Sequence, residues 1–167
     1  MLRTVGLIVR GLNVLNWVAA AAFLLFLILT FTAEQRIAAA IASRYPGTQA
    51  GAILTDIRLV MVVGLASVVP AHILLVRLGA ILRSVETGDA FVAANGTRLR
   101  QMGWALLSLQ ILDLGFGWVA LRVSATTNEY LGWSLSITGW LSVLLVFVLA
   151  RVWTQGAAMR DELEGTV

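Results

Sequence analysis

The apolar stretch at residues 59–78 (LVMVVGLASVVPAHILLVRL) decides the fold of this chain. A helix rises about 1.5 Å per residue, so these residues would cover the roughly 30 Å hydrocarbon core of a bilayer. The stretch holds one charged residue, Arg77, close to its end. It also lacks the alternation of apolar and polar residues that is typical of a strand. It therefore predicts a membrane-spanning helix.

Three further stretches share this length and character, namely residues 12–31, 102–121 and 132–153. A secretory signal peptide is the competing interpretation of residues 12–31, but the usual apolar core of such a peptide is only about 7–15 residues long. The four stretches predict an all-α protein, a four-helix transmembrane bundle that forms a single domain over residues 1–167.

Composition agrees with a protein inside a lipid bilayer. The chain has 167 residues, of which 59% are hydrophobic, whereas soluble domains have about 45–50%. Its pI of about 10.6 would suit a nucleic-acid partner. All twelve basic residues are arginines, however, scattered beside apolar stretches rather than gathered in a stripe. The lipid bilayer is therefore the expected partner, and direct nucleic-acid binding is not expected.

The arginines are unevenly divided between the two sides of the predicted bundle. Four fall on one side: Arg36, Arg44, Arg58 and Arg122. Eight fall on the side of both termini and the loop at 79–101: Arg3, Arg10, Arg77, Arg83, Arg98, Arg100, Arg151 and Arg160. Arginine and lysine are enriched in cytoplasmic connections. Both termini and this loop are thus predicted to be cytoplasmic, in a bacterial inner membrane.

The connection at 32–58 predicts a short amphipathic helix. Thr32 and Gln35 match a capping box. Ile37, Ile41 and Tyr45 then recur every four residues before Pro46 and Gly47 end the pattern. This helix is expected to lie on the outer membrane surface or to cap the bundle.

Polar residues inside the predicted spans form a candidate intramembrane site: His72, Gln110, Asp113 and Ser142. Asp113 lies near the middle of its span, where a lone carboxylate is costly. His72 and Asp113 differ by nearly two helical turns in depth, so Ser108 or Gln110 is a better-levelled partner for His72.

Hydrogen bonds that fix helix register are the favoured role of these residues, and a proton relay or ion path is the alternative. A metal site is not expected, because it needs three or four ligands and the chain has one histidine and no cysteine. No cofactor is expected. An intramembrane hydrolase using Ser108 and His72 is conceivable, but the chain is predicted not to be an enzyme.

The most polar segment is residues 88–104 (GDAFVAANGTRLRQMGW). Phe91, Asn95, Leu99 and Met102 share one helix face with Arg98. Either Asp89 caps a short interfacial loop helix, or Asn95 caps the third span. The segment is a hinge between spans and, as a hypothesis, a docking surface.

A motif in this segment resembles the signature of a bacterial membrane family catalogued as domain of unknown function 2975. Its residues here are Gly88, Asp89, Phe91, Asn95, Arg98, Leu99, Arg100 and Gly103. The closing segment at 152–167 is also similar to the end of that family. The resemblance implies a four-helix membrane protein without an established function. Members are often encoded beside a small helix-turn-helix regulator, which implies a membrane partner that controls the regulator.

These observations predict an uncharacterised integral membrane protein with a regulatory or scaffolding role. Its cytoplasmic loop at 79–101 and its carboxy-terminal tail would contact a protein partner such as a small helix-turn-helix regulator. The alternative function is a small transporter or proton-coupled sensor centred on Asp113.

Overall fold

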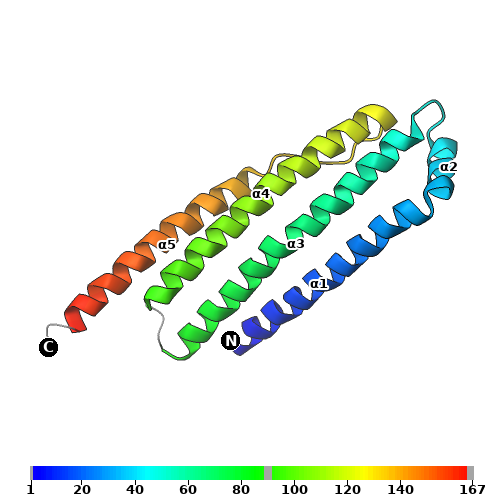
Figure 1. Cartoon of the computed structure of the whole chain (residues 1–167). Helices are drawn as coiled ribbons and strands as arrows, with labels where there is room; N and C mark the ends of the chain where they lie inside the picture. Colours follow the sequence, from blue (N-terminus) through cyan, green and yellow to red (C-terminus); the bar gives the residue numbers. More distant parts are fainter. Residues whose placement is uncertain (1, 89–91, 165–167) are drawn as a thin grey trace. The chain divides into compact units, whose positions relative to one another are not determined.

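The computed structural model describes residues 2–88 and 92–164, which form five helices and no strand (Figure 1). The helices are α1 (Leu2–Thr32), α2 (Glu34–Arg44), α3 (Ala50–Glu86), α4 (Ala93–Thr127) and α5 (Ile137–Glu164). Four segments are long and apolar enough to cross a membrane: Thr4–Thr32, Ala50–Glu86, Ala93–Thr127 and Ile137–Arg160. The predicted all-α class, with four spanning helices and a short extra helix, is confirmed.

The spanning helices are longer than the apolar stretches that predict them. Helix α3 has 37 residues, whereas its predicted span covers residues 59–78. It ends where Gly88 takes a left-handed conformation, with φ +85°, and where the Gly88 N–H donates to the Val85 carbonyl at 3.2 Å. Glycine adopts this conformation at no steric cost. Gly88 therefore ends this helix.

The helical residues predicted for the cytoplasmic loop belong to α4. This helix begins at Ala93 and continues without a break into the span. The separate loop helix is therefore wrong for the described residues, because residues 93–101 contain no proline that would interrupt the hydrogen-bond pattern. Asn95 lies within the first turn of α4 instead of capping it, and its N–H donates to the Val92 carbonyl at 2.9 Å. Asp89 and Phe91 lie outside the described residues.

The fourth span begins later than predicted, at Ile137 rather than at residue 132. Two left-handed residues, Asn128 (φ 59°) and Gly132 (φ 69°), keep the preceding segment out of the helix. The Ser136 hydroxyl then accepts a hydrogen bond from the Gly139 N–H at 3.1 Å. This is the contact of an amino-terminal cap, and it sets the first residue of α5.

The predicted capping box at Thr32 is also wrong. Thr32 is the last residue of α1, and its hydroxyl donates back to the Ile28 carbonyl at 3.3 Å. Ala33 precedes α2 and makes no side-chain cap. The predicted end of α2 is confirmed: the helix stops at Arg44, and Gly47 has φ +87°.

The chain divides into two compact units, and helices α1, α3 and α4 contribute to both. Unit 1 takes in the residues up to 16, 69–110 and those from 136 onward, and its buried cluster is Leu99, Met102 and Ala150. Unit 2 takes in residues 17–68 and 111–135, and its buried cluster is Ile41, Ile53 and Leu54. Ile37 and Tyr45 pack against the second cluster, as their four-residue spacing predicts. The single domain over residues 1–167 stays a prediction.

Positions on α4 at seven-residue intervals face residues of α5 or of the segment before it. Seven residues make almost two full turns, so these positions lie on one helix face. At the three glycines among them a side chain would collide with the facing residue, and the close approach of Gln110 has the same effect at Gly139. The facing pairs are Gly96 with Thr154, Gly103 with Phe147, Gln110 with Gly139, and Gly117 with Trp133. Each pair lies within one of the two units.

Candidate functional site

His72 on α3 is held by Asn13 on α1. The His72 Nδ1 and the Asn13 Oδ1 lie 2.8 Å apart, and both side chains are half-buried. The contact fixes the rotation of two spanning helices against each other, which is the role expected of polar side chains in membranes. Asn13 is absent from the predicted site residues. The signal for it was available, because Asn13 and His72 fall toward the same predicted side of the membrane.

Gln110 serves helix packing, whereas Ser142 makes a hydrogen bond within its own helix. Gln110 is half-buried, and its side-chain amide lies directly against Gly139 of α5. Ser142 is exposed, and its hydroxyl donates to the Thr138 carbonyl in its own helix at 2.8 Å. Ser108 makes the same kind of contact with the Trp104 carbonyl at 2.9 Å. These hydroxyl contacts lie within single helices.

Asp113 stands apart from this group. Its side chain is half-buried, and no hydrogen bond or ion pair joins it to another residue in the described part of the chain. Among residues 2–88 and 92–164, no three acidic or histidine side chains gather closely enough to hold a metal ion. Asp113 is thus a single carboxylate near the middle of a spanning helix.

Asn95 is the centre of the motif at residues 88–103. It is fully buried, at 0% exposure. Its Nδ2 donates to the Ser84 hydroxyl at 2.7 Å, and its Oδ1 accepts from the Arg98 Nη1 at 2.7 Å. Because Ser84 belongs to α3, this amide joins the end of α3 to the beginning of α4.

The two arginines of the motif have different surroundings. Arg98 is half-buried, and its Nη1 also reaches the Ala80 carbonyl at 3.5 Å. Arg100 is exposed, and no hydrogen bond or ion pair ties it to a described residue. Arg98 therefore serves the structure, whereas the charge of Arg100 is available to a partner.

The motif residues Leu99 and Gly103, with Gly96 between them and Asn95, pack against the middle of α5. Leu99 is buried in a cluster with Ala150, against which Trp153 packs. Gly96 lies against Thr154, and Gly103 against the Phe147 ring. The beginning of α4 and residues 147–154 of α5 consequently pack together within unit 1.

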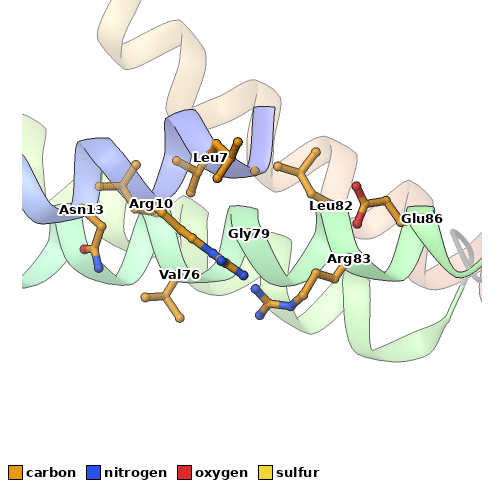
Figure 2. A pocket seen from close by; sticks show the side chains of 11 residues that line it. Leu7, Arg10, Asn13, Val76, Gly79, Leu82, Arg83 and Glu86 are labelled. Carbon is orange, nitrogen blue, oxygen red and sulfur yellow. The ribbon is translucent and has the colours of Figure 1, made fainter. Parts of the chain in front are cut away.

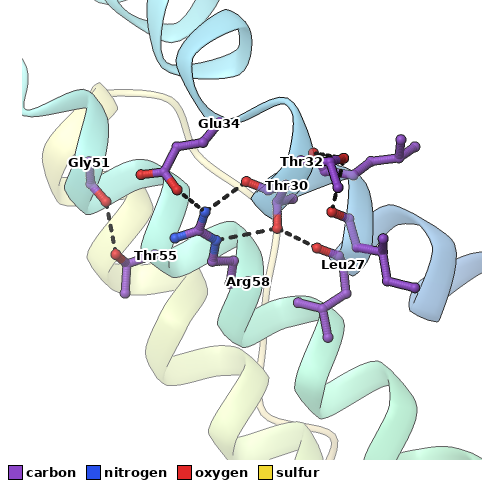
Figure 3. Close-up of polar contacts among 9 residues, drawn as sticks. Leu27, Thr30, Thr32, Glu34, Gly51, Thr55 and Arg58 are labelled. Atoms are coloured by element: carbon purple, nitrogen blue, oxygen red, sulfur yellow. Dashed lines mark hydrogen bonds and ion pairs between the residues drawn. The ribbon is translucent and has the colours of Figure 1, made fainter.

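Unit 2 contains a polar cluster that is absent from the predicted site (Figure 3). Arg58 on α3 donates to the Thr30 carbonyl at 2.7 Å and to the Glu34 Oε2 at 2.8 Å. Its guanidinium also lies 4.1 Å from the centre of the Phe31 ring. One side chain thereby ties together the end of α1, the beginning of α2, and α3.

Two further ion pairs lie in the same unit. Arg122 on α4 reaches the Asp56 Oδ1 at 3.2 Å, and the Asp56 side chain is only 3% exposed. Glu129 pairs with Arg44 at 3.4 Å and accepts a hydrogen bond from the Tyr45 hydroxyl at 2.7 Å. This hydrogen bond, together with the negative charge of Glu129, raises the pKa of the exposed Tyr45 phenol. Acidic partners therefore hold three of the four arginines predicted to lie outside.

Comparison with known proteins gives one match. The family model described as "Protein of unknown function (DUF2975)" matches residues 32–167. Neither a curated protein nor a solved structure matches the chain.

Proposed function

The chain belongs to the DUF2975 family of proteins of unknown function, and on that premise we propose that this multi-pass membrane protein has a regulatory or scaffolding role. The loop at 79–101 and the carboxy-terminal tail face the bacterial cytoplasm. Together they contact a protein partner such as a small helix-turn-helix regulator, and the chain catalyses no reaction.

The main support is the packing of the family motif against α5. Gly96 lies against Thr154, and Leu99 lies against Ala150 and Trp153, so the beginning of α4 is held against residues 150–154 of α5, the helix that leads to the tail. A partner could thus contact both segments at once. Arg100 supplies an exposed positive charge on the first of them.

The polar contacts in unit 2 support the orientation. Arg44, Arg58 and Arg122 are paired with Glu129, Glu34 and Asp56. These three arginines on the predicted outer side thus serve ion pairs. The larger number of arginines on the opposite side favours a cytoplasmic location for that side.

Co-purification tests the docking role. The protein is produced together with a small helix-turn-helix regulator, the proposed class of partner, extracted in mild detergent and captured. Recovery of the regulator should fall several-fold in the Arg100→Ala variant. It should be unchanged in the matched control Arg36→Ala, because Arg36 is an exposed arginine on α2. Equal recovery with all three proteins, or none with the wild type, would contradict the proposal.

A second candidate function rests on Asp113. A half-buried carboxylate without a protein partner among the described residues suits the uptake and release of a proton. In this proposal the protein is a small transporter or a proton-coupled sensor. Vesicles containing the protein under a pH gradient should pass protons faster than empty vesicles. Asp113→Asn should abolish the difference and Ser142→Ala should keep it, and an equal rate in empty vesicles would contradict this candidate.

A further inference from the structure

A cavity of about 370 Å³ lies between α1 and α3, within unit 1 (Figure 2). Its walls come from residues 6–13 of α1 and residues 75–86 of α3. These are the amino-terminal part of α1 and the carboxy-terminal part of α3, and both are predicted to lie toward the cytoplasm. The side chains that line it fall into a basic group and an apolar group.

Two arginines from different helices share this cavity. Arg10 comes from α1 and Arg83 from α3, and their guanidinium groups extend toward each other over Gly79 in Figure 2. A side chain at Gly79 would begin 3.8 Å from the Arg83 Nη1, so the glycine leaves this space open. Neither guanidinium forms a hydrogen bond or an ion pair with a described residue. Two like charges that converge without a counterion favour binding of an anion.

Asn13 adds a neutral donor to the same wall. It lies one turn from Arg10 on α1 and lines the cavity. Its Oδ1 contacts the His72 Nδ1. An amide oxygen can only accept a hydrogen bond, so the His72 Nδ1 is the donor in this contact. The Asn13 Nδ2 group then remains to donate into the cavity. The two guanidinium groups, from two helices, are thus available to one anionic group, and in Figure 2 the Asn13 amide lies apart from them in the same cavity.

The rest of the lining is mostly apolar. Leu7 and Val9 form one wall, and Leu75, Val76 and Leu82 form the other. Glu86 is the acidic residue of the lining. It makes no ion pair with Arg10 or Arg83, and in Figure 2 its carboxylate lies beside Leu82. The positive charge of the cavity therefore exceeds its negative charge.

We propose that this cavity binds one anionic phospholipid. The headgroup phosphate accepts hydrogen bonds from Arg10 and Arg83, and the acyl chains lie along the apolar walls. An arginine guanidinium matches phosphate oxygens in two-pronged geometry. Because both helices cross the membrane, the ligand that meets this cavity at high concentration is a lipid, so a phospholipid is favoured over soluble phosphate.

Native mass spectrometry of the full-length protein in detergent tests the proposal. Phosphatidylglycerol and phosphatidylcholine with identical acyl chains are titrated separately. The wild type should bind phosphatidylglycerol more tightly. Each of Arg10→Gln and Arg83→Gln should weaken that binding about fivefold, as expected when one arginine no longer attracts an anionic headgroup. The double variant should bind both lipids equally.

Arg151→Gln is the matched control, because Arg151 is an exposed arginine on the same predicted side but does not line the cavity. It should bind phosphatidylglycerol as the wild type does. A wild type without preference for phosphatidylglycerol would overturn the proposal, whether or not the variants fold. So would an undiminished preference in the Arg10→Gln, Arg83→Gln double variant.

Inorganic phosphate separates the lipid from a soluble anion. Millimolar phosphate should leave bound phosphatidylglycerol in place, because it cannot contact the apolar walls. Complete displacement by phosphate would show a site for a soluble anion and would overturn the assignment to a lipid.

Discussion

Asn95 shows how much one polar side chain can contribute to a largely apolar protein. Its amide uses the donor end for Ser84 and the acceptor end for Arg98, while the residue itself is fully buried. A buried polar group is tolerated when it is hydrogen-bonded and is costly when it is not. The Asn95 amide supplies both a donor and an acceptor at this point.

Asn95→Ala should therefore destabilise the protein. Removing the amide leaves Ser84 and Arg98 without this partner, and a buried group left unsatisfied costs roughly 1–3 kcal/mol. The measurement is the free energy of unfolding in detergent micelles. Thr97→Ala is the control, since Thr97 is exposed two residues away, and it should change stability by less than about 0.5 kcal/mol. Equal effects of the two substitutions would contradict the role of Asn95.

The Tyr45 phenol should titrate above its ordinary pKa of 10.0, because its hydrogen bond to the Glu129 carboxylate favours the neutral form. A raised pKa means that the contact is fully present below the ordinary value and is lost as the pH rises through the raised one. Glu129→Ala should shift the titration to lower pH. Phenolate absorbance measures this.

The chain has two tyrosines, so the titration belongs in a Tyr130→Phe background in which only Tyr45 contributes. Tyr45→Phe in the same background should remove the signal. An identical midpoint with and without Glu129 would rule out the hydrogen bond in solution.

At the level of the helices, hydropathy predicted which segments span and did not predict where they end. The apolar stretch at 59–78 lies inside α3, whose bounds depend on Gly88 and on polar residues that remain helical beyond the lipid. Residues 132–136 belong to the predicted fourth span, yet Gly132 and the Ser136 cap place them outside α5. Hydropathy carries no information about these backbone conformations.

The partners of the predicted site residues were harder to predict than the helices. The apolar spans have no polar face that would indicate their rotation, so depth was the only guide to the partner of His72. Depth favoured Ser108 or Gln110, whereas the contact that the structure describes is with Asn13. Asp56 and Arg122 are also far apart in sequence, and only helix packing brings them together. Asn95 and Leu99, which the spacing of the motif places on one helix face, do lie buried.

The pairing of α4 with α5 predicts the effect of a larger residue at Gly103. The Phe147 ring lies 2.9 Å from the position that a side chain would take there. Gly103→Leu should thus overpack the contact and cost about 1–3 kcal/mol of stability. Thermal unfolding in detergent micelles measures the loss.

A compensating change tests whether this loss comes from the contact itself. Phe147→Ala should restore part of the stability of the Gly103→Leu variant, although it destabilises the wild type. Gly11→Leu is a control at a helical glycine with nothing within 4 Å. Additive effects of Gly103→Leu and Phe147→Ala would show that the two residues do not interact.

For the whole molecule, the absence of cysteine makes orientation directly measurable. A single introduced cysteine is a unique site for a maleimide that cannot cross the membrane. In intact cells whose outer membrane is permeable to the reagent, Gln35→Cys on α2 should react. Arg100→Cys should react only after the inner membrane is opened. Both positions are exposed, so access to the side chain does not limit either reaction.

The opposite labelling pattern would invert the topology and place the α4 motif outside the cell. Reaction of both positions in intact cells would indicate damaged membranes, and this is checked with a cytoplasmic marker protein. The labelling result is independent of any partner, so it tests orientation separately from docking.

The facing pairs along α4 also constrain how this chain can change in length. Gly103 with Phe147 and Gln110 with Gly139 are successive contacts of an antiparallel helix pair. One residue inserted between Gly103 and Gln110 would turn every later side chain by about 100°, away from its partner. An insertion of seven residues would turn the later side chains back toward α5, but it would move them about 10 Å along the helix axis. Insertions or deletions are therefore tolerated here only when both helices change together by the same seven residues.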